Sequence, residues 1–194
     1  MRRFAFIVCG LLAAATYLSA QTAGTAKLAG TAKPPAAAQA ASPVMVIETE
    51  KGTIEIQLFQ SEAPKSVDHI VALANKNFYR SQRFHRVETS VVQFGDPQSR
   101  DMTKQGSWGT GSSYNPIGVV ELTKRKNVRG MVGLAHSGNA KLADSQLYIL
   151  KRANPTLDGQ HVVVGQVVSG MAVVDKLERA DMLKMVTIKA AGQK

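Results

Sequence analysis

From Val44 onward, the chain consists of short strand-like runs separated by turn-forming residues. VMVIETE and TIEIQLF flank Lys51-Gly52, a pattern that predicts a β-hairpin. Further runs of this kind occupy residues 83–87, 91–95, 130–135, 145–151, 162–168 and 185–190. Because many short strands need to bury their apolar faces together, the pattern favours a closed or nearly closed antiparallel barrel.

Two stretches depart from the strand pattern and predict helices. APKSVDHIVALANKNF places Val67, Ile70, Val71 and Ala74 on one helical face, and Pro64 suits a first helical turn. A short helix is expected around residues 171–178. Residues 98–118 are rich in Gly, Ser and Asn, so a long loop is expected there.

The N-terminal residues have the layout of a secretory signal. Two arginines precede an apolar run from Phe4 to Leu18, and Ser19-Ala20 supplies small residues for cleavage. The run is shorter than the roughly 20 residues that span a bilayer, so residues 1–20 are interpreted as a signal peptide cut after Ala20. A retained signal anchor is the alternative. Cys9, the single cysteine, lies in this segment, so the mature chain would have no disulfide and no thiolate site.

Residues 21–43 have the composition of a disordered tether. The unit AGTAK occurs twice, Ala dominates, and Leu28 is the only large apolar residue. Such a stretch cannot bury enough apolar surface to offset the chain entropy lost on folding. The sequence therefore predicts a folded domain over residues 44–194.

The charge of the chain is strongly positive, with 24 Lys and Arg against 14 Asp and Glu, or +10. Arg2, Arg3, Lys27 and Lys33 precede the domain, which therefore carries +6. Such a surface favours acidic partners or anionic membrane surfaces. No nucleic-acid role is expected, because the basic residues are scattered and no aromatic platform is interleaved with them.

Several polar residues interrupt the apolar runs. FHRVETSVVQFGD places Arg86 and Gln93 among valines and phenylalanines, with no carboxylate expected to pair with the arginine. Gln146 starts a later run, and His161 follows the Asp158-Gly159 turn. Each has a simple structural explanation: a solvent-facing arginine, a glutamine that satisfies a backbone group, and a packed histidine.

Several common catalytic schemes do not match these residues. No G-x-S-x-G turn offers an acyl-transfer serine, and His69, His85, His136 and His161 lack zinc-motif spacing. WGTGSSYNP is not followed by Lys-Ser/Thr, so it is interpreted as a flexible surface turn and not a phosphate loop. No metal or cofactor is therefore expected.

The order of the motifs, however, resembles the cyclophilins, which are peptidyl-prolyl cis/trans isomerases. The resemblance runs over residues 44–190: KGTIEIQLF and the helix, FHR with a downstream Q-x-G-D, GLAHSG, SQLYI, and LDGQHVVVG. It implies a closed eight-stranded antiparallel barrel capped by two helices. It also implies isomerase activity without a cofactor. The expected substrates are proline-containing peptide segments, and the protein is expected to be a monomer.

The resemblance also assigns roles to individual residues. Arg86 would donate a hydrogen bond to the prolyl nitrogen, and Gln93 would orient it. The peptide groove would be lined by Ala135, His136 and Gln146. The apolar proline pocket would be formed by Val91, Tyr148 and Leu157, and His161 would close its edge. With the signal peptide, this predicts a periplasmic or secreted enzyme that acts on exported proteins and is not stably inserted in the membrane.

The chain departs from the family around the pocket. ETS replaces the family's apolar-Pro-Gly stretch with one residue fewer, so Ser90 would occupy the place of the pocket phenylalanine. Val91, Phe94 or Trp108 could fill the vacated space. Phe94 also replaces a glycine, Tyr148 a phenylalanine, and Thr156 a tryptophan that contacts cyclosporin in several eukaryotic members. A proline-peptide-binding or chaperone-like module with little turnover is therefore the alternative function.

Overall fold

The computed structural model describes residues 42–190. The predicted signal peptide, its cleavage site after Ala20, Cys9 and the tether as far as Ala41 lie outside the described residues. Within residues 42–190, no helix combines the length and the apolar character needed to cross a membrane.

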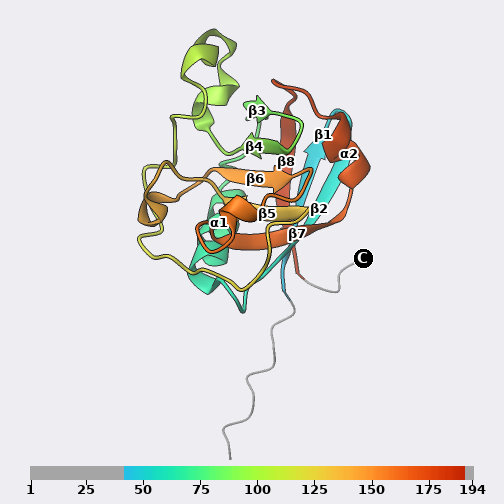
Figure 1. The fold of residues 1–194 in the computed structure, drawn as a ribbon. Helices are drawn as coiled ribbons and strands as arrows, with labels where there is room; N and C mark the ends of the chain where they lie inside the picture. The colour runs from blue at the N-terminus through green and yellow to red at the C-terminus, as the bar shows by residue number, and fades with distance from the viewer. Residues whose placement is uncertain (1–41, 191–194) are drawn as a thin grey trace, which may run out of the picture. The chain divides into compact units, whose positions relative to one another are not determined.

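Eight antiparallel strands form one sheet in the order β3-β4-β6-β5-β7-β2-β1-β8. Figure 1 shows β3, β4, β6, β5 and β7 one below another, with β1, β2 and β8 beside them. The strands are β1 (Val44–Thr49), β2 (Gly52–Leu58), β3 (Arg86–Val87), β4 (Val91–Phe94), β5 (Met131–Leu134), β6 (Leu147–Leu150), β7 (Val163–Ser169) and β8 (Leu183–Lys189). The predicted hairpin is confirmed, with Thr49 opposite Gly52.

The sheet curls until its two ends meet. The segment before β3 pairs with the segment before β8, through an isolated bridge between Arg83 and Met182 and backbone hydrogen bonds such as Leu183 N to Gln82 O (2.8 Å). These bonds satisfy polar groups that an open sheet edge would expose. The barrel prediction is therefore confirmed, but the strand expected at 83–87 is only two residues long, because residues 83–85 contribute to this seam.

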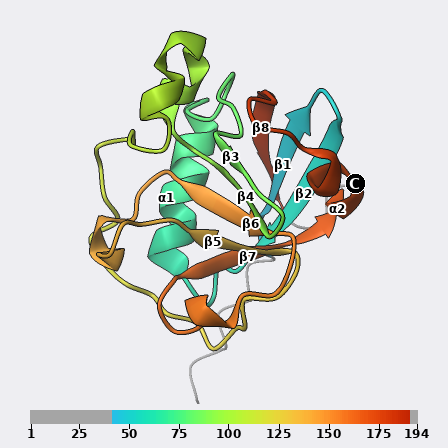
Figure 2. The ribbon, with the colours of Figure 1, turned by 45° about the horizontal axis from the view of Figure 1, so that its top comes forward.

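Two helices accompany the barrel, α1 (Pro64–Asn75) and α2 (Met171–Lys176). Figures 1 and 2 show α1 running behind β5 and β6. Val67, Ile70 and Ala74 are buried as predicted, whereas Val71 is half-buried at the edge of that face. The helix thus packs one apolar stripe into the main core, which also holds the inward side chains of the strands.

The predicted long loop is confirmed, but it contains two short 3-10 helices, Pro97–Arg100 and Met102–Ser107, and irregular chain continues to residue 130. Its later part supplies the cap of α1. The Glu121 carboxylate accepts hydrogen bonds from Lys65 N (3.1 Å), Ser66 N (2.8 Å) and Ser66 Oγ (2.7 Å). A negative charge at this position satisfies free backbone donors and complements the helix dipole.

We expect Glu121→Ala to lower the free energy of unfolding by about 1–2 kcal/mol, because helix donors lose a charged acceptor. Burial would raise the pKa of Glu121, but the hydrogen bonds from Ser66 and Lys65 outweigh it and lower the pKa. The contribution is therefore present above pH 4.5 and lost as pH falls through the lowered pKa. Urea unfolding at several pH values tests this, with exposed Glu50→Ala as the control. An equal effect of both variants would contradict it.

Candidate active site

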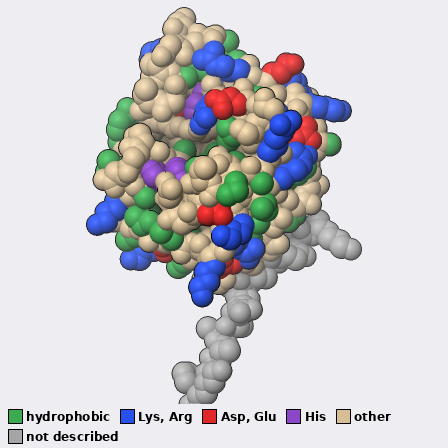
Figure 3. Space-filling view, in the orientation of Figure 1, with side chains coloured by type: hydrophobic (Ala, Val, Ile, Leu, Met, Phe, Trp, Pro, Cys, Tyr) green, Lys and Arg blue, Asp and Glu red, His purple; other side chains and the backbone are tan. Residues whose placement is uncertain are grey.

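A cavity of about 770 Å³ is lined in part by residues of β3, β4 and β6. Figure 3 looks onto this side of the domain, where histidine side chains reach the surface. The cavity is lined by every predicted site residue: Arg86, Ser90, Val91, Gln93, Ala135, His136, Gln146, Tyr148, Leu157 and His161. Residues that are up to 75 positions apart in the sequence are thus brought to one place.

A chain of side-chain amides links Arg86 to the opposite wall of the cavity. Arg86 and Gln93 face each other across β3 and β4, and Arg86 Nη1 donates to Gln93 Oε1 (3.4 Å). Gln93 Nε2 then donates to Gln146 Oε1 (2.7 Å), and Gln146 Nε2 donates to the carbonyls of Gly109 (2.8 Å) and Gly111 (2.7 Å). This network fixes the orientation of both side-chain amides. Gln146 also satisfies backbone carbonyls, as expected from the sequence.

The expectation that Arg86 has no carboxylate partner is wrong. Glu88 binds the guanidinium with both oxygens, at 2.8 Å from Nε and 3.0 Å from Nη2. Side chains two residues apart on an extended chain project to the same side, so Glu88 lies next to Arg86. Arg86 is half exposed, and one N–H on each terminal nitrogen remains beyond the three engaged donors. It can therefore still bind a ligand in the cavity.

The floor of the cavity is apolar. Val91, Tyr148 and Leu150 belong to a small buried cluster, against which Leu157 packs. Tyr148 donates its hydroxyl to Asn127 Oδ1 (2.9 Å), and its ring lies where a Cβ at Gly133 would stand, so a glycine is required there. Burial raises the pKa of Tyr148, which stays a neutral phenol. The floor therefore offers an uncharged apolar surface to a ligand.

Of the residues that could replace the missing phenylalanine, only Val91 lines the cavity. Phe94 points away from Gln93 into the main core, with ring centroids 5.9 Å from Tyr79 and 5.6 Å from Phe84. Trp108 packs against the Arg179 guanidinium and donates to Asp101 O. Ser90 therefore occupies the wall at the predicted position, without an aromatic side chain over it.

Two histidines close one edge of the cavity. The rings of His136 and His161 stack with centroids 4.1 Å apart, and His161 Nδ1 contacts Leu134 O at 3.1 Å. Burial, with a smaller contribution from His136, lowers the pKa of His161. The stacked rings offer a flat aromatic surface. Within residues 42–190, no group of three His, Cys, Asp or Glu is placed to hold a metal ion.

The glycine-rich segment that the sequence suggested as a flexible surface turn lines the cavity instead. Gly109, Thr110, Gly111 and Ser112 form its far wall, and the segment is held by two buried carboxylates. Asp96 accepts from Gly109 N (2.5 Å), and Asp144 accepts from Ser113 Oγ (2.5 Å) and from Asn115 N (3.3 Å). The pattern of closely spaced glycines was the available signal, because it permits this close backbone approach.

His85 lies below this wall and is not part of the cavity lining. It is buried, both ring nitrogens lack a hydrogen-bond partner within the described domain, and burial lowers its pKa from 6.5 to about 4. Between these two values the unfolded chain binds a proton that the folded domain excludes. Folding stability should therefore decrease as pH falls through this window.

We expect His85→Leu to flatten the pH dependence of unfolding between about pH 6.5 and pH 4, where the wild-type domain loses up to about 3 kcal/mol through this residue. Leucine fits because the imidazole makes no hydrogen bond there. Urea unfolding of both proteins at half-unit pH steps measures the slopes. Parallel curves would show that His85 finds a partner for its proton.

The sequence is also similar to those of known proteins. Residues 44–193 match the sequence profile of the cyclophilin type peptidyl-prolyl cis-trans isomerase family. The chain belongs to the cyclophilins. A probable peptidyl-prolyl cis-trans isomerase of Brucella suis is 38% identical over 148 residues, covering 73% of this chain and 76% of the relative. The isomerase of Helicobacter pylori is 34% identical, covering 75% and 86%.

Solved cyclophilins share the fold. A cyclophilin type peptidyl-prolyl cis-trans isomerase of Cryptosporidium parvum, crystallised in the presence of the dipeptide Ala-Pro, superposes with a TM-score of 0.65 at 22% identity. The match covers 75% of this chain and 98% of that protein. The family and its curated relatives identify this cyclophilin as a peptidyl-prolyl cis-trans isomerase, as the order of motifs predicted.

Proposed function

We propose that this cyclophilin isomerises prolyl peptide bonds of exported proteins, with Arg86 as the catalytic residue. The observation that carries the proposal is the fixed guanidinium beside an apolar floor formed by Val91, Tyr148 and Leu157. The floor would hold the proline ring, and the Arg86–Gln93–Gln146 network would hold the peptide backbone and the guanidinium. The Cryptosporidium relative was crystallised in the presence of Ala-Pro, a dipeptide that contains proline, which supports a proline-containing ligand for this chain.

The chemistry needs only a placed cation. Resonance gives the X–Pro bond a rotation barrier of about 18–20 kcal/mol. At the top of the barrier resonance is lost, and the prolyl nitrogen regains a lone pair that can accept a hydrogen bond. A fixed guanidinium N–H stabilises this twisted amide more than the planar one, which is selective binding of the transition state. Glu88 keeps the guanidinium plane oriented, since it binds the Nε and Nη2 side bidentately.

The proposed activity is tested by isomerisation of a proline tetrapeptide by the purified domain, residues 42–194. Two-dimensional exchange NMR reports cis/trans exchange directly. Exchange accelerated by catalytic amounts of the domain supports the enzyme. Binding of the peptide without acceleration would favour the alternative, a proline-binding or chaperone-like module, which the absence of a pocket aromatic at Ser90 supports.

Export rests on the signal layout of residues 1–20. We expect the mature protein to begin near Gln21, in the periplasm or outside the cell, with residues 21–43 as a tether. Intact mass of the protein recovered from cell fractions should show the loss of the first ~20 residues. Full-length protein in the membrane fraction would instead indicate a retained signal anchor.

A further inference from the structure

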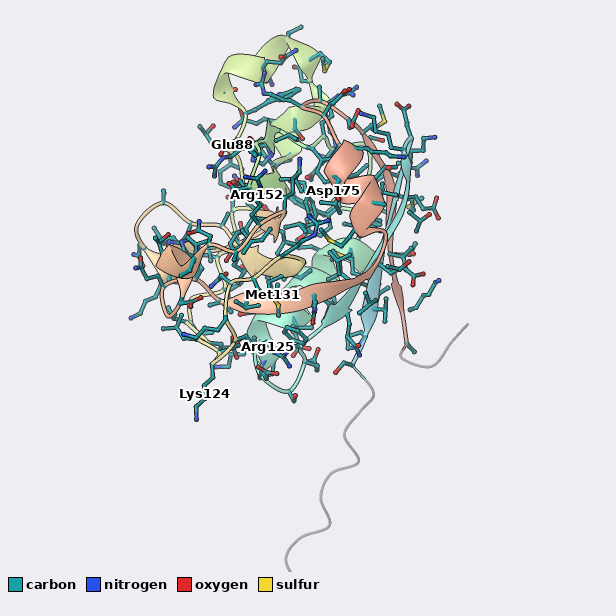
Figure 4. The ribbon with its side chains drawn as sticks, turned by 45° about the vertical axis from the view of Figure 1, so that its right-hand side comes forward. Glu88, Lys124, Arg125, Met131, Arg152 and Asp175 are labelled. Atoms are coloured by element: carbon teal, nitrogen blue, oxygen red, sulfur yellow. The ribbon has the colours of Figure 1, made fainter. Side chains whose placement is uncertain are left out.

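A second, smaller cavity lies directly behind the Glu88–Ser90 turn. Val87, Glu88 and Thr89 form its near wall, and Ser90, the next residue, lines the candidate active site. The far wall consists of Arg129, Lys151, Arg152 and Asp175. Figure 4 shows the labelled side chains of Glu88, Arg152 and Asp175 on the same face of the domain. One short turn thus separates the proline pocket from a charged hollow.

The turn is fixed to the far wall by its backbone. Ser90 O accepts hydrogen bonds from Lys151 N (2.8 Å) and Arg152 N (3.3 Å), at the point where β6 ends. The two cationic residues therefore keep a constant position relative to the pocket residue Ser90. If the proline of a bound peptide occupies the pocket, the part of the peptide that extends toward the second cavity has to cross this turn.

Charge in the second cavity is unbalanced. Both of its carboxylates are already paired: Glu88 with Arg86 (2.8 Å), and Asp175 with Arg129 through two hydrogen bonds of 2.9 and 2.6 Å. Among residues 42–190, Lys151 and Arg152 have no carboxylate within 4.0 Å, and Lys151 influences Asp175 only at longer range. Two positive charges therefore remain without a direct partner beside the exit from the pocket.

We propose that Lys151 and Arg152 form a subsite for an acidic side chain of the substrate, close to the isomerised proline. This inference rests on the proposed function, since it needs a proline peptide in the neighbouring pocket. The favoured substrates are proline segments with Asp or Glu within three residues of the proline, on the side that crosses the Glu88–Ser90 turn. Arg152 can bind a carboxylate bidentately, and Lys151 adds a point charge.

The location predicts a one-sided preference. The opposite end of the active-site cavity is formed by the Gly109–Ser112 segment and Leu142, with the Asp144 carboxylate behind them and no Lys or Arg among the described residues that line this end. A carboxylate on that side of the proline therefore gains no local attraction. In contrast, a carboxylate on the turn side contacts the exposed Arg152 and the half-buried Lys151, for which about a 2- to 10-fold gain in kcat/KM is expected at low salt.

The test compares octapeptides with one proline and Glu or Gln at each of three positions on either side. We expect the Glu:Gln ratio of kcat/KM to be 2- to 10-fold on one side only, and to fall at high salt. In Lys151→Gln/Arg152→Gln the ratio should approach one. The control Lys76→Gln/Lys184→Gln removes the same charge from outside both cavities and should retain the ratio.

Three outcomes overturn the subsite: a ratio of one everywhere in wild type, an equal preference on both sides, or a preference that survives the double substitution. Turnover of the all-Gln peptide by wild type reports on the isomerase itself. If that peptide is not turned over, the proposed function has failed, and Glu:Gln ratios of peptide Kd still decide the subsite.

Discussion

Replacing Arg86 with alanine is expected to reduce kcat/KM on a proline tetrapeptide by about 10²–10³-fold. Removal of one preorganised donor aimed at developing electron density costs about 2.7–4 kcal/mol of transition-state stabilisation. Among residues 42–190, Arg86 is the only arginine that lines the cavity. Exchange NMR or a coupled assay on the purified domain measures the loss.

The fold should survive this substitution. The Arg86 side chain is 51% exposed, and its partners Glu88 and Gln93 stay accessible to water, so no core cavity is opened. The unfolding midpoint should therefore stay close to that of wild type. Arg86→Lys keeps the charge but loses the planar fork, and an intermediate activity is expected. A folded Arg86→Ala variant with wild-type turnover would disprove the arginine mechanism for this chain.

The second large effect is a gain: Ser90→Phe should raise kcat/KM by about 10- to 200-fold. Ser90 lines the cavity and carries a hydroxyl in place of an apolar side chain. A missing hydrophobic contact in a pocket is worth about 1–3 kcal/mol. Phe94 and Trp108 cannot substitute, because both are held elsewhere.

A matched control uses an exposed serine outside both cavities. Ser61 lines neither the active site nor the second cavity, so Ser61→Phe adds the same ring away from the substrate and should leave the rate unchanged. The wild type should also bind cyclosporin weakly, since Thr156 and Ser90 both lack an aromatic side chain. An unchanged or lower rate for Ser90→Phe would show that Val91 already completes the pocket.

Local residue patterns in the sequence were sufficient to predict most of the secondary structure of this protein. Alternation of apolar residues identified the hairpin and the strands, and a helical stripe with Pro64 identified α1, because these signals lie within a few residues of each other. The resemblance to the cyclophilins implied one site for Arg86, Gln93, Gln146 and His161, and all four line one cavity. Alternation along β4 also places Phe94 on the opposite face from Gln93, and Phe94 is buried in the main core.

Contacts between distant segments required the tertiary structure. The seam between residues 81–84 and 180–183, the wall formed by Gly109–Ser112 and the placement of Lys151 and Arg152 beside Ser90 all join segments that no sequence period relates. The Glu88–Arg86 pair is local, yet it depended on the shape of a shortened turn. Periodicity reports which face of an element is buried, whereas these contacts depend on how the curled sheet brings the ends of separate strands together.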